Sequence, residues 1–502
     1  MAQSTSTLFS DLERRCAELR DLDHLGSILG WDQEVLMPAA AAESRAQALA
    51  TLARVTHERS VDPALLDLLG ELRERTAELE PEQQRAVALA WRRVRPASQI
   101  PAELAAEFAL TKARALEAWR AARQASDFEA FRPWLEQLVA LARRIAEATR
   151  AGGELYDALL DTYEPEARSA AVLPLLEDLA RSSAPLLERV RAAAGSQRTK
   201  VARRRYPLAD QQAFVLEVLG RMGFDFERGR LDRSTHPFCG GNGPTDVRLT
   251  TRHAEKDLRV GLYGAIHEAG HGLYEQGLDP ARSRSILGGA VSMAIHESQS
   301  RLWENLVGRS RAFWKFWWKP LKRRFPQATQ GYKSEDMWRA VNAIEPSFIR
   351  VEADELTYNL HILLRTRLEE GLISGSLAVA DLPAAWNQGL RDLLGLEVEN
   401  DAQGCLQDIH WSMGAFGYFP TYSLGNLYAA QFMEAAREEL GDLDAAFASG
   451  EFLPLRRWLQ REIHRHDQLE TPAELVQRIS GRPLDSAAWQ RAMGAKIDAL
   501  LA

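Results

Sequence analysis

Residues 265–275 of this chain read AIHEAGHGLYE and place His267 and His271 four positions apart, with Glu268 directly after the first histidine. On a helix, residues i and i+4 share one face with Cβ atoms about 5–6 Å apart, so both imidazoles can reach one metal ion. Glu268 is rotated by about 100° from His267 and reaches the water beside the ion. The pattern predicts metal-dependent hydrolysis; the alternative is a pair of hydrogen-bonded core histidines on an ordinary helix.

A catalytic zinc ion needs a third protein ligand and one open coordination position. The stretch ILGGAVSMAIHESQSRLWENLVGR (286–309) predicts a second helix, with His296 and Glu297 side by side. Adjacent helical residues point about 100° apart, so only one of the two reaches the ion. The spacing leaves both open, because Glu297 would complete a His₂Glu set and His296 a His₃ set. A solvent-facing glutamate on an amphipathic helix is the structural alternative.

Gly270 and Gly272 lie in the same stretch as the two histidines and lower its helix propensity. Flanking apolar residues such as Ile266 and Leu273 indicate that this helix is buried. Glycine is favoured where another chain segment comes close, because it has no Cβ atom. We therefore expect a second backbone or a substrate to approach the helix at these glycines.

Most of the chain has the apolar spacing of helices. Residues 103–124 and 131–150 place apolar side chains at intervals of three and four. Proline predicts breaks at residues 93–101 and after Arg181. Residues 246–251, DVRLTT, instead alternate with period two, which predicts a strand with one buried and one polar face. The sequence thus predicts an all-α fold with a small β-sheet near the predicted metal site.

The composition argues against several classes of protein. The 502 residues have a formal net charge of −8 and a pI of about 5.9, which gives no basic field for nucleic acid phosphates. The N-terminus lacks the layout of a signal peptide, and no apolar run reaches the roughly 18–20 residues that span a bilayer. Cys16, Cys239 and Cys405 have no CxxC spacing, which favours a reduced, cytoplasmic protein without disulfides. We predict no nucleic acid partner and no membrane association.

No repeat and no low-complexity linker divides the chain. We predict one domain over residues 1–502, with an N-terminal helical side of roughly residues 1–200 and a metal-site side of roughly residues 201–502. The aromatic stretch AFWKFWWKP (312–320) is expected to be a helix that packs its aromatic face inwards and ends at Pro320.

Six short segments form an ordered set of motifs along the chain. They are HPF (236–238), DVRLT (246–250), HEAGH (267–271), HESQ (296–299), IRVEAD (349–354) and GCLQDIHW (404–411). In this order they resemble the carboxypeptidase Taq family of metallocarboxypeptidases, which are helical zinc peptidases. WDQEVLMP (31–38) and GYFPTYSLGNLYAAQ (417–431) also resemble family segments, so the resemblance covers essentially the whole chain.

The resemblance implies that His267, His271 and Glu297 bind the metal ion, because Glu297 stands in HESQ where the family has its third ligand. It also implies that Glu268 is the general acid/base. The implied fold is an almost entirely helical, elongated body with a deep active-site cleft and a small sheet near the active site. Family members are commonly homodimers. The expected cofactor is Zn²⁺, with Co²⁺ as the alternative, because a His₂Glu site accepts both.

The segment GCLQDIHWSMGAFGYFPTY (404–422) is the expected source of donors for an oxyanion. His410 can donate through an imidazole nitrogen, and Tyr418 or Tyr422 through a phenol hydroxyl. Related helical zinc peptidases place a histidine and a tyrosine at a broadly similar separation, and Tyr422 is slightly favoured over Tyr418. Aromatic packing in a glycine-rich turn is the alternative for both tyrosines.

A carboxypeptidase must bind a free terminal carboxylate, and a planar guanidinium suits that task. Arg350 in IRVEAD is the first candidate, and an ion pair with Asp354 is its structural alternative. Arg248 on the predicted strand is the second candidate. The same strand is expected to offer an edge to an extended peptide. His236 precedes Pro237 and so lies in an extended turn, where it either borders the cleft or orders the turn.

The sequence therefore predicts a metal-dependent carboxypeptidase that releases single C-terminal residues from peptides with broad specificity. A zinc-activated water would attack the peptide bond, with Glu268 as the general acid/base. A zinc endopeptidase or a dipeptidyl-type peptidase of the same fold is the alternative among enzymes. A non-catalytic helical scaffold that binds peptides is the alternative outside enzymes. Glu268 counts against the scaffold, because a non-catalytic metal site does not need that carboxylate.

Overall fold

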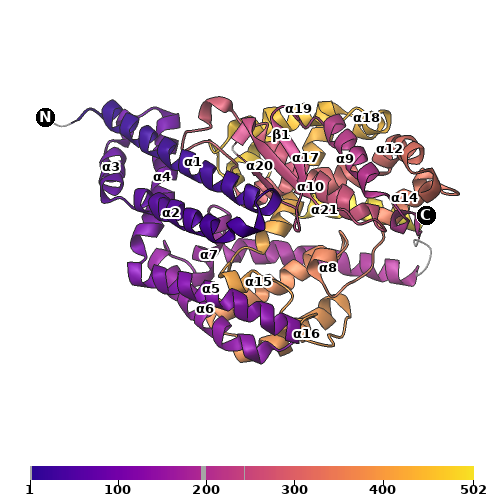
Figure 1. The fold of residues 1–502 in the computed structure, drawn as a ribbon, viewed down its shortest axis with the longest axis horizontal. Coiled ribbons are helices and arrows are strands. Elements are labelled where there is room, and N and C mark those ends of the chain that lie inside the picture. Colours follow the sequence, from indigo (N-terminus) through magenta and orange to yellow (C-terminus); the bar gives the residue numbers. More distant parts are fainter. Residues whose placement is uncertain (1–2, 194–198, 242) are drawn as a thin grey trace.

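Helices dominate the structure, a computed structural model that describes residues 3–193, 199–241 and 243–502 (Figure 1). About 72% of the residues are helical, and one small sheet accompanies them. The predicted mainly helical fold with a small sheet is therefore confirmed. The body is longest along the horizontal axis of Figure 1, and the N-terminal helices lie at one end of it.

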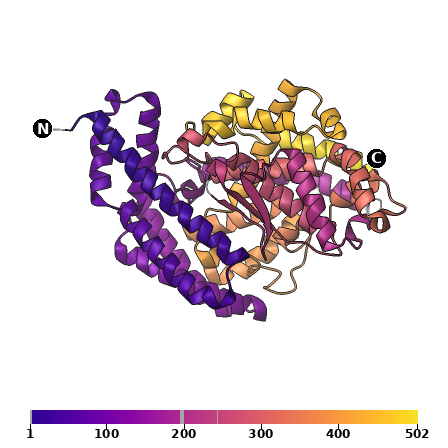
Figure 2. The same ribbon diagram turned by 45° about the horizontal axis from the view of Figure 1, so that its top comes forward.

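The first four α-helices lie together, and three of them share a core of their own. They are α1 (Thr5–Val35), α2 (Ala42–Ser60), α3 (Pro63–Glu74) and α4 (Pro81–Gln99). The cluster runs from Leu8 to Val94 with residues of α1, α3 and α4, and Leu287 joins it from later in the chain, whereas α2 has no buried residue. Figure 2 shows these indigo helices gathered on one side of the molecule.

Five α-helices follow before the sheet in the part of the chain that the structure describes. They are α5 (Ala102–Ala125), α6 (Phe128–Thr149), α7 (Leu155–Tyr163), α8 (Ser169–Ala192) and α9 (Leu208–Met222). Helices α5 and α6 confirm the predictions for residues 103–124 and 131–150. The predicted break after Arg181 is wrong, because α8 continues through Pro185. Burial of Leu179 and Leu187 on either side of this proline keeps the segment helical.

The sheet has three strands, β1 (Gly229–Arg233), β2 (Cys239–Gly241) and β3 (Val247–Thr251). Their order is β1-β3-β2, with β3 parallel to β1 and antiparallel to β2. Strand β3 confirms the strand predicted at residues 246–251. The expectation that this strand offers an edge to a peptide is wrong, because β3 is paired on both sides. The prediction of a polar face is also wrong at Thr250, which is fully buried.

The remaining helices form the larger part of the molecule, and most of them enclose the second core cluster. They are α10 (Leu258–Glu275), α11 (Met293–Arg301), the π-helix η6 (Leu302–Gly308), α12 (Arg311–Arg324), α13 (Pro326–Thr329), α14 (Ser334–Val341), α15 (Tyr358–Ser374), α16 (Leu382–Leu394), α17 (Pro420–Leu440), α18 (Leu443–Ser449), α19 (Leu453–Glu462), α20 (Pro472–Ser480) and α21 (Ala487–Leu501). This cluster runs from Ala115 to Leu500 and includes the buried residues of α10 and α11. The division of the single domain near residue 200 stays a prediction.

Helix α12 contains the aromatic stretch 312–320 and buries Phe313, Trp314 and Trp317. The inward aromatic face is as expected, but the predicted end at Pro320 is wrong, since the helix continues to Arg324. Within the part of the chain that the structure describes, no helix has the length and apolar character to cross a membrane.

Candidate metal centre

Helices α10 and α11 approach each other so closely that only glycine fits where they touch. A Cβ atom on Gly270 would lie 2.5 Å from the Cα atom of Ser300 in α11. A Cβ atom on Gly272 would lie 2.8 Å from a side-chain carbon of Leu249 in β3. The expected approach of a second backbone is therefore confirmed at Gly270, whereas Gly272 makes room for side chains of the sheet.

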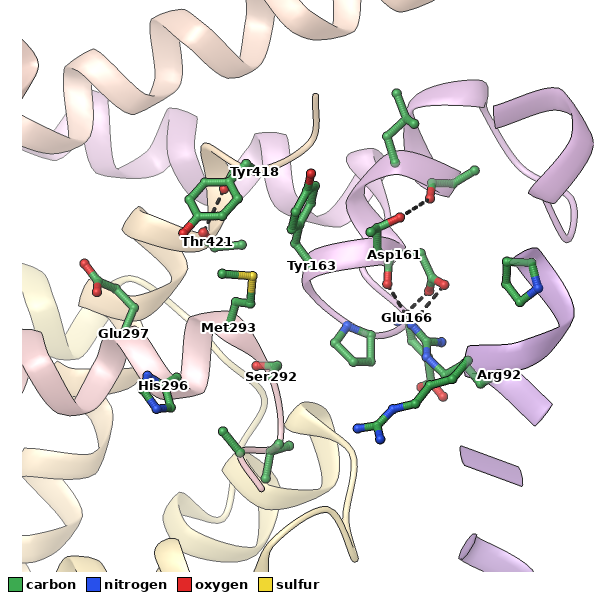
Figure 3. A pocket seen from close by; sticks show the side chains of 18 of the residues that line it. Arg92, Asp161, Tyr163, Glu166, Ser292, Met293, His296, Glu297, Tyr418 and Thr421 are labelled. Carbon is green, nitrogen blue, oxygen red and sulfur yellow. Dashed lines mark hydrogen bonds and ion pairs between the residues drawn. The ribbon is translucent and has the colours of Figure 1, made fainter. Parts of the chain in front are cut away.

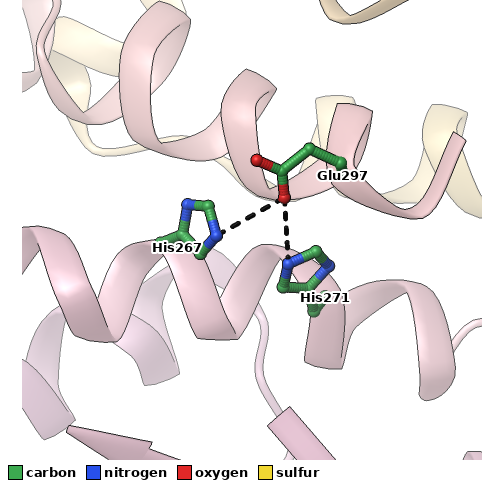
Figure 4. Close-up of side chains that lie close together, drawn as sticks. All are labelled: His267, His271 and Glu297. Atoms are coloured by element: carbon green, nitrogen blue, oxygen red, sulfur yellow. Dashed lines mark ion pairs between the residues drawn. The ribbon is translucent and has the colours of Figure 1, made fainter. Parts of the chain in front are cut away.

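His267 and His271 project from α10 towards Glu297 on α11 (Figure 4). Oε2 of Glu297 lies 3.5 Å from Nε2 of His267 and 3.3 Å from Nε2 of His271. The three donor atoms lie within 4.8 Å of one another, and no other such group occurs among the described residues. This arrangement is a candidate site for one metal ion with a His₂Glu ligand set.

His296, the other residue that the spacing left open, turns away from this cluster. Its Nε2 lies 2.9 Å from Oε1 of Glu275, and its ring stacks on that of His271 with centroids 4.5 Å apart. The structure thus brings Glu297, and not His296, to the two histidines. The stacked ring of His296 supports His271 from one side.

A carboxylate that the sequence analysis missed holds the second nitrogen of His267. Nδ1 of His267 lies 2.9 Å from Oε2 of Glu304, which belongs to the π-helix η6 directly after α11. Burial opposes ionisation of Glu304, but the hydrogen bond from His267 and the charge of Arg309 hold the pKa of its carboxyl well below its usual range. Ligand histidines commonly use their second nitrogen in this way, which leaves Nε2 free for the ion.

The donor set fits a divalent metal ion. Two imidazole nitrogens and one carboxylate oxygen converge, and the group is largely shielded from solvent. Nε of Arg301 donates a hydrogen bond of 2.6 Å to Oε1 of Glu297, which leaves Oε2 turned towards the histidines. Mixed histidine and carboxylate sets of this kind are typical of catalytic zinc sites.

A cavity of about 1190 Å³ borders the cluster. Helices α4 to α7 form one wall, while α10, α11 and the start of α17 form the other. Glu268 lines this cavity beside His267 and His271. Burial, together with the charge of Glu297, raises the pKa of Glu268 to about 7, although the charge of His267 opposes this rise. A carboxyl group with a pKa near neutrality can both take up and release a proton.

The segment 404–422 brings its histidine and tyrosines to the same region. Nε2 of His410 lies 3.2 Å from the hydroxyl oxygen of Tyr422, and the rings of Tyr418 and Tyr422 meet edge to face with centroids 5.3 Å apart. Both tyrosines line the cavity, whereas His410 does not. Burial lowers the pKa of His410 to about 4, so the ring is neutral at pH 7 and carries one N–H.

Helix α15 fixes this segment at several points. Glu369 accepts hydrogen bonds of 2.9 Å from Nε1 of Trp411 and from the backbone N–H of Gly417. Nε of Arg365 donates a hydrogen bond of 2.6 Å to Asp408. Each anchor lies close in sequence to His410 or Tyr418, so the helix restricts the positions of both side chains.

Arg350 is buried and does not line the cavity. Its Nε and Nη2 atoms donate to Oδ1 of Asp408 at 3.0 and 2.8 Å, and Nη1 donates to the hydroxyl of Tyr358 at 3.0 Å. The guanidinium carbon also lies 5.0 Å from the ring centre of Tyr422. The ion-pair partner of Arg350 is therefore Asp408, and not Asp354 as expected for the structural alternative.

Arg248 and His236 also lie outside the cavity lining. Arg248 forms an ion pair of 2.9 Å with Asp246 and stacks at 4.3 Å on the ring of Trp31 in α1. His236 is exposed, and its carbonyl oxygen accepts a hydrogen bond from Ser234. The residues that follow His236, at positions 237–239, do line the cavity.

Three residues near the site carry no motif, namely Tyr163, Met293 and Glu304. Glu304 lies seven residues after Glu297, a spacing that puts both on one face of a helix, and this was the only signal in the sequence. Tyr163 and Met293 line the cavity from α7 and α11, and both lie outside the motifs of the sequence. Proximity in the fold identifies all three.

An HExxH helix whose two histidines meet a glutamate from the next helix defines a helical metallopeptidase. The model of the family described as "Carboxypeptidase Taq (M32) metallopeptidase" matches residues 11–497, and the chain belongs to this family. It is therefore a carboxypeptidase, a metal-dependent hydrolase of peptides.

Individual relatives agree with this assignment over nearly the whole chain. "Thermostable carboxypeptidase 1" of Thermus thermophilus is 44% identical over 477 residues, which are 92% of each chain. "Carboxypeptidase 1" of Bacillus subtilis is 37% identical over 459 residues, which cover 91% of this chain and 92% of the relative. The crystal structure of the M32 carboxypeptidase from Deinococcus radiodurans superposes with a TM-score of 0.95 at 40% identity, covering 99% of both chains.

Proposed function

We propose that this carboxypeptidase releases single residues from the free C-terminus of peptides with broad specificity. The convergence of Nε2 of His267, Nε2 of His271 and Oε2 of Glu297 beside Glu268 supports this proposal most strongly. The three residues would hold Zn²⁺, with Co²⁺ as the alternative. When bound, such an ion polarises the scissile carbonyl and lowers the pKa of a water molecule towards ~7.

Glu268 acts as the general acid/base in this proposal. Its carboxylate accepts a proton from the attacking water and passes it to the amine that leaves. The buried position beside His267 and the pKa near 7 suit both transfers, because the group is present in each protonation state at neutral pH.

His410 and Tyr422 stabilise the oxyanion that develops on the carbonyl oxygen. Tyr422 lines the cavity and keeps its proton, because burial raises its pKa well above the usual value. The 3.2 Å contact with His410 and the anchors on α15 hold the phenol in one orientation. Tyr418 is the second candidate donor, since it lines the same wall. A donor that is already in position costs no reorganisation during the reaction.

Arg350 binds the terminal carboxylate in this proposal, and Arg248 is the weaker candidate. The guanidinium of Arg350 lies against Tyr422, whereas that of Arg248 lies against Trp31 on α1. The hydrogen bonds of Arg350 to Asp408 compete with a substrate carboxylate. Lys112 is a further candidate for binding the terminal carboxylate, because it lines the cavity and forms no ion pair with any described residue. His236 orders the turn that brings residues 237–239 to the cavity.

A homodimer and a cytoplasmic location are further proposals that rest on the family resemblance and on the free cysteines. Light scattering after size exclusion, with and without metal, tests the dimer. The competing functions are an endopeptidase or dipeptidyl-type peptidase with the same metal site, and a peptide-binding scaffold without catalysis.

A mass-spectrometric time course on one peptide, with a free or an amidated C-terminus and with or without chelator, separates these functions. We expect a ladder that loses one residue at a time from the free C-terminus, and no ladder with the amide or the chelator. Internal cuts or release of dipeptides in both peptides would favour the other peptidases. Absence of cleavage after Zn²⁺ or Co²⁺ is added back would favour the scaffold.

A further inference from the structure

Met293 exposes an apolar side chain next to the candidate metal site. It is 40% exposed at the start of α11, although six of the other eight residues of this helix are buried. Its side chain lines the 1190 Å³ cavity rather than the outer surface. Removal of such apolar surface from water is favourable, so an apolar group that covers Met293 would bind there.

The position of Met293 ties it to the reacting bond. It precedes Glu297 by four residues, so the two side chains leave the same face of α11 about 5–6 Å apart. The start of the helix is fixed, because Ser292 caps it and the carboxylate of Glu164 accepts a hydrogen bond of 3.2 Å from the N–H of Ala294. Met293 thus stands one helical turn from a candidate metal ligand.

Tyr163 faces Met293 across the cavity (Figure 3). It belongs to the last turn of α7, and its ring meets that of Tyr418 edge to face with centroids 5.1 Å apart. Leu159, one turn earlier on α7, lines the same cavity. Leu159, Tyr163 and Tyr418 thus add one aliphatic side chain and two phenol rings to the cavity that Met293 lines.

One pair of charged groups on this side of the cavity neutralises itself. Arg92 and Asp161 form an ion pair of 2.9 Å, and they lie beyond Tyr163 as seen from Glu297 (Figure 3). A charged substrate side chain between Met293 and Tyr163 would lose water without gaining a partner, which is costly. An aliphatic or aromatic side chain would bury apolar surface there.

We propose that Met293, Tyr163 and Leu159 form a subsite for the side chain of a residue next to the cleaved bond, and that this subsite selects aliphatic and aromatic side chains over charged ones. The inference rests on the proposed peptidase function. Methionine is flexible and polarisable, so one pocket adapts to several apolar shapes. The subsite would allow broad use of apolar residues while it disfavours lysine and glutamate.

The test uses the metal-loaded enzyme and one peptide backbone with Leu, Phe, Lys or Glu at the last or at the penultimate position. We expect wild-type kcat/KM to be at least about tenfold higher for Leu and Phe than for Lys and Glu at one of these positions. Met293→Glu should raise the Lys-to-Leu ratio at that position at least about tenfold. Leu216→Glu on α9, where Leu216 is 36% exposed outside the cavity, is the matched control and should leave the ratio unchanged.

Met293→Ala provides a second variant if the charged one does not fold, and it should narrow the Leu-to-Lys ratio. An unchanged ratio at both positions, in whichever variants fold, would overturn the subsite. Failure of the proposed function can be distinguished from failure of the subsite. Mass spectrometry of the wild-type products shows which bond is cut, whatever the ratio of kcat/KM values. If cleavage is internal, the same ratios at the residues that flank the cut still decide the subsite.

Discussion

Nδ1 of His267 and Oε2 of Glu304 lie 2.9 Å apart, and this contact turns the opposite nitrogen of the imidazole towards Glu297. Replacing Glu304 by Gln removes the charge that stabilises this orientation. We expect the dissociation constant of Zn²⁺ to rise about 10- to 100-fold, as is usual when a carboxylate partner of a ligand histidine is lost. Competition with a fluorescent chelator measures it. Wild-type affinity in a folded variant would remove Glu304 from the metal site.

Glu268→Gln keeps the size of the side chain and removes its proton transfer. We expect metal content to stay at the wild-type value while kcat falls by about 10²–10⁴-fold, because a positioned acid/base contributes that much. Metal analysis and kinetics on the same preparation measure both quantities. Activity within tenfold of wild type would exclude Glu268 from the mechanism.

Gly270→Ala places a methyl group against the backbone of α11, since its Cβ atom would lie 2.5 Å from Cα of Ser300. Backbone cannot yield as a side chain does, so we expect a loss of about 1–3 kcal/mol in unfolding free energy and weaker metal binding. Gly494→Ala in α21 is the matched control. A Cβ atom there has no neighbour within 4 Å, and alanine should stabilise that helix by up to ~1 kcal/mol. Equal effects of both changes, by chemical denaturation, would contradict the packing argument.

Arg350→Ala tests whether Arg350 binds the terminal carboxylate of the substrate. We expect kcat/KM for a peptide with a free C-terminus to fall about 100-fold, because a buried guanidinium–carboxylate contact contributes roughly 2–3 kcal/mol. Internal cleavage of the amidated peptide, where any occurs, should change little. Lys112→Ala and Arg248→Ala are measured in parallel, because Lys112 and Arg248 are the other candidates for binding the terminal carboxylate. Loss of activity towards both peptides, together with a lower melting temperature, would make Arg350 structural through its bonds to Asp408.

Glu164 makes the stability of the α7–α11 contact dependent on pH. Burial raises its pKa to about 7 from 4.5, against the hydrogen bonds from Ser292 and the N–H of Ala294. The folded state therefore binds an extra proton between these values, so this contribution to stability is full below pH 4.5 and is lost as the pH rises through about 7. Glu164→Gln imitates the protonated acid and should remove this dependence.

Melting temperatures at pH 5 and pH 8 measure the effect. The melting temperature of Glu164→Gln minus that of wild type should be about 2–5 °C higher at pH 8 than at pH 5. Glu166→Gln, on an exposed neighbour, serves as the control. A constant difference between Glu164→Gln and wild type at both pH values would show that Glu164 is ionised throughout.

The residues of the candidate metal site were predictable because their signals are local. The i, i+4 spacing determines that His267 and His271 share a helix face, and the family motif favours Glu297 over His296. The long amphipathic helices and the strand at residues 246–251 follow from periodicity in the same way. Gly270 even indicated where a second backbone would approach.

Partners that lie far apart in the chain could not be predicted. Arg350 binds Asp408, which lies 58 positions away, although Asp354 one helical turn on was the nearer partner in sequence. The edge strand β2 has only three residues in a glycine-rich stretch and carries no alternating pattern. In both cases the tertiary packing, and not the local sequence, determines the contact.

The π-helix η6 gives the chain a neighbour spacing that an α-helix lacks. At its wide turn, the backbone N–H of Arg309 donates a hydrogen bond to the carbonyl oxygen of Glu304, five residues earlier. The side chains of the two residues also meet, because Nη2 of Arg309 lies 2.9 Å from Oε1 of Glu304. We therefore expect the number of residues between positions 302 and 308 to affect metal binding at the candidate site. Insertion or deletion of a single residue there should displace Glu304 from His267, although the three candidate ligands themselves stay unchanged.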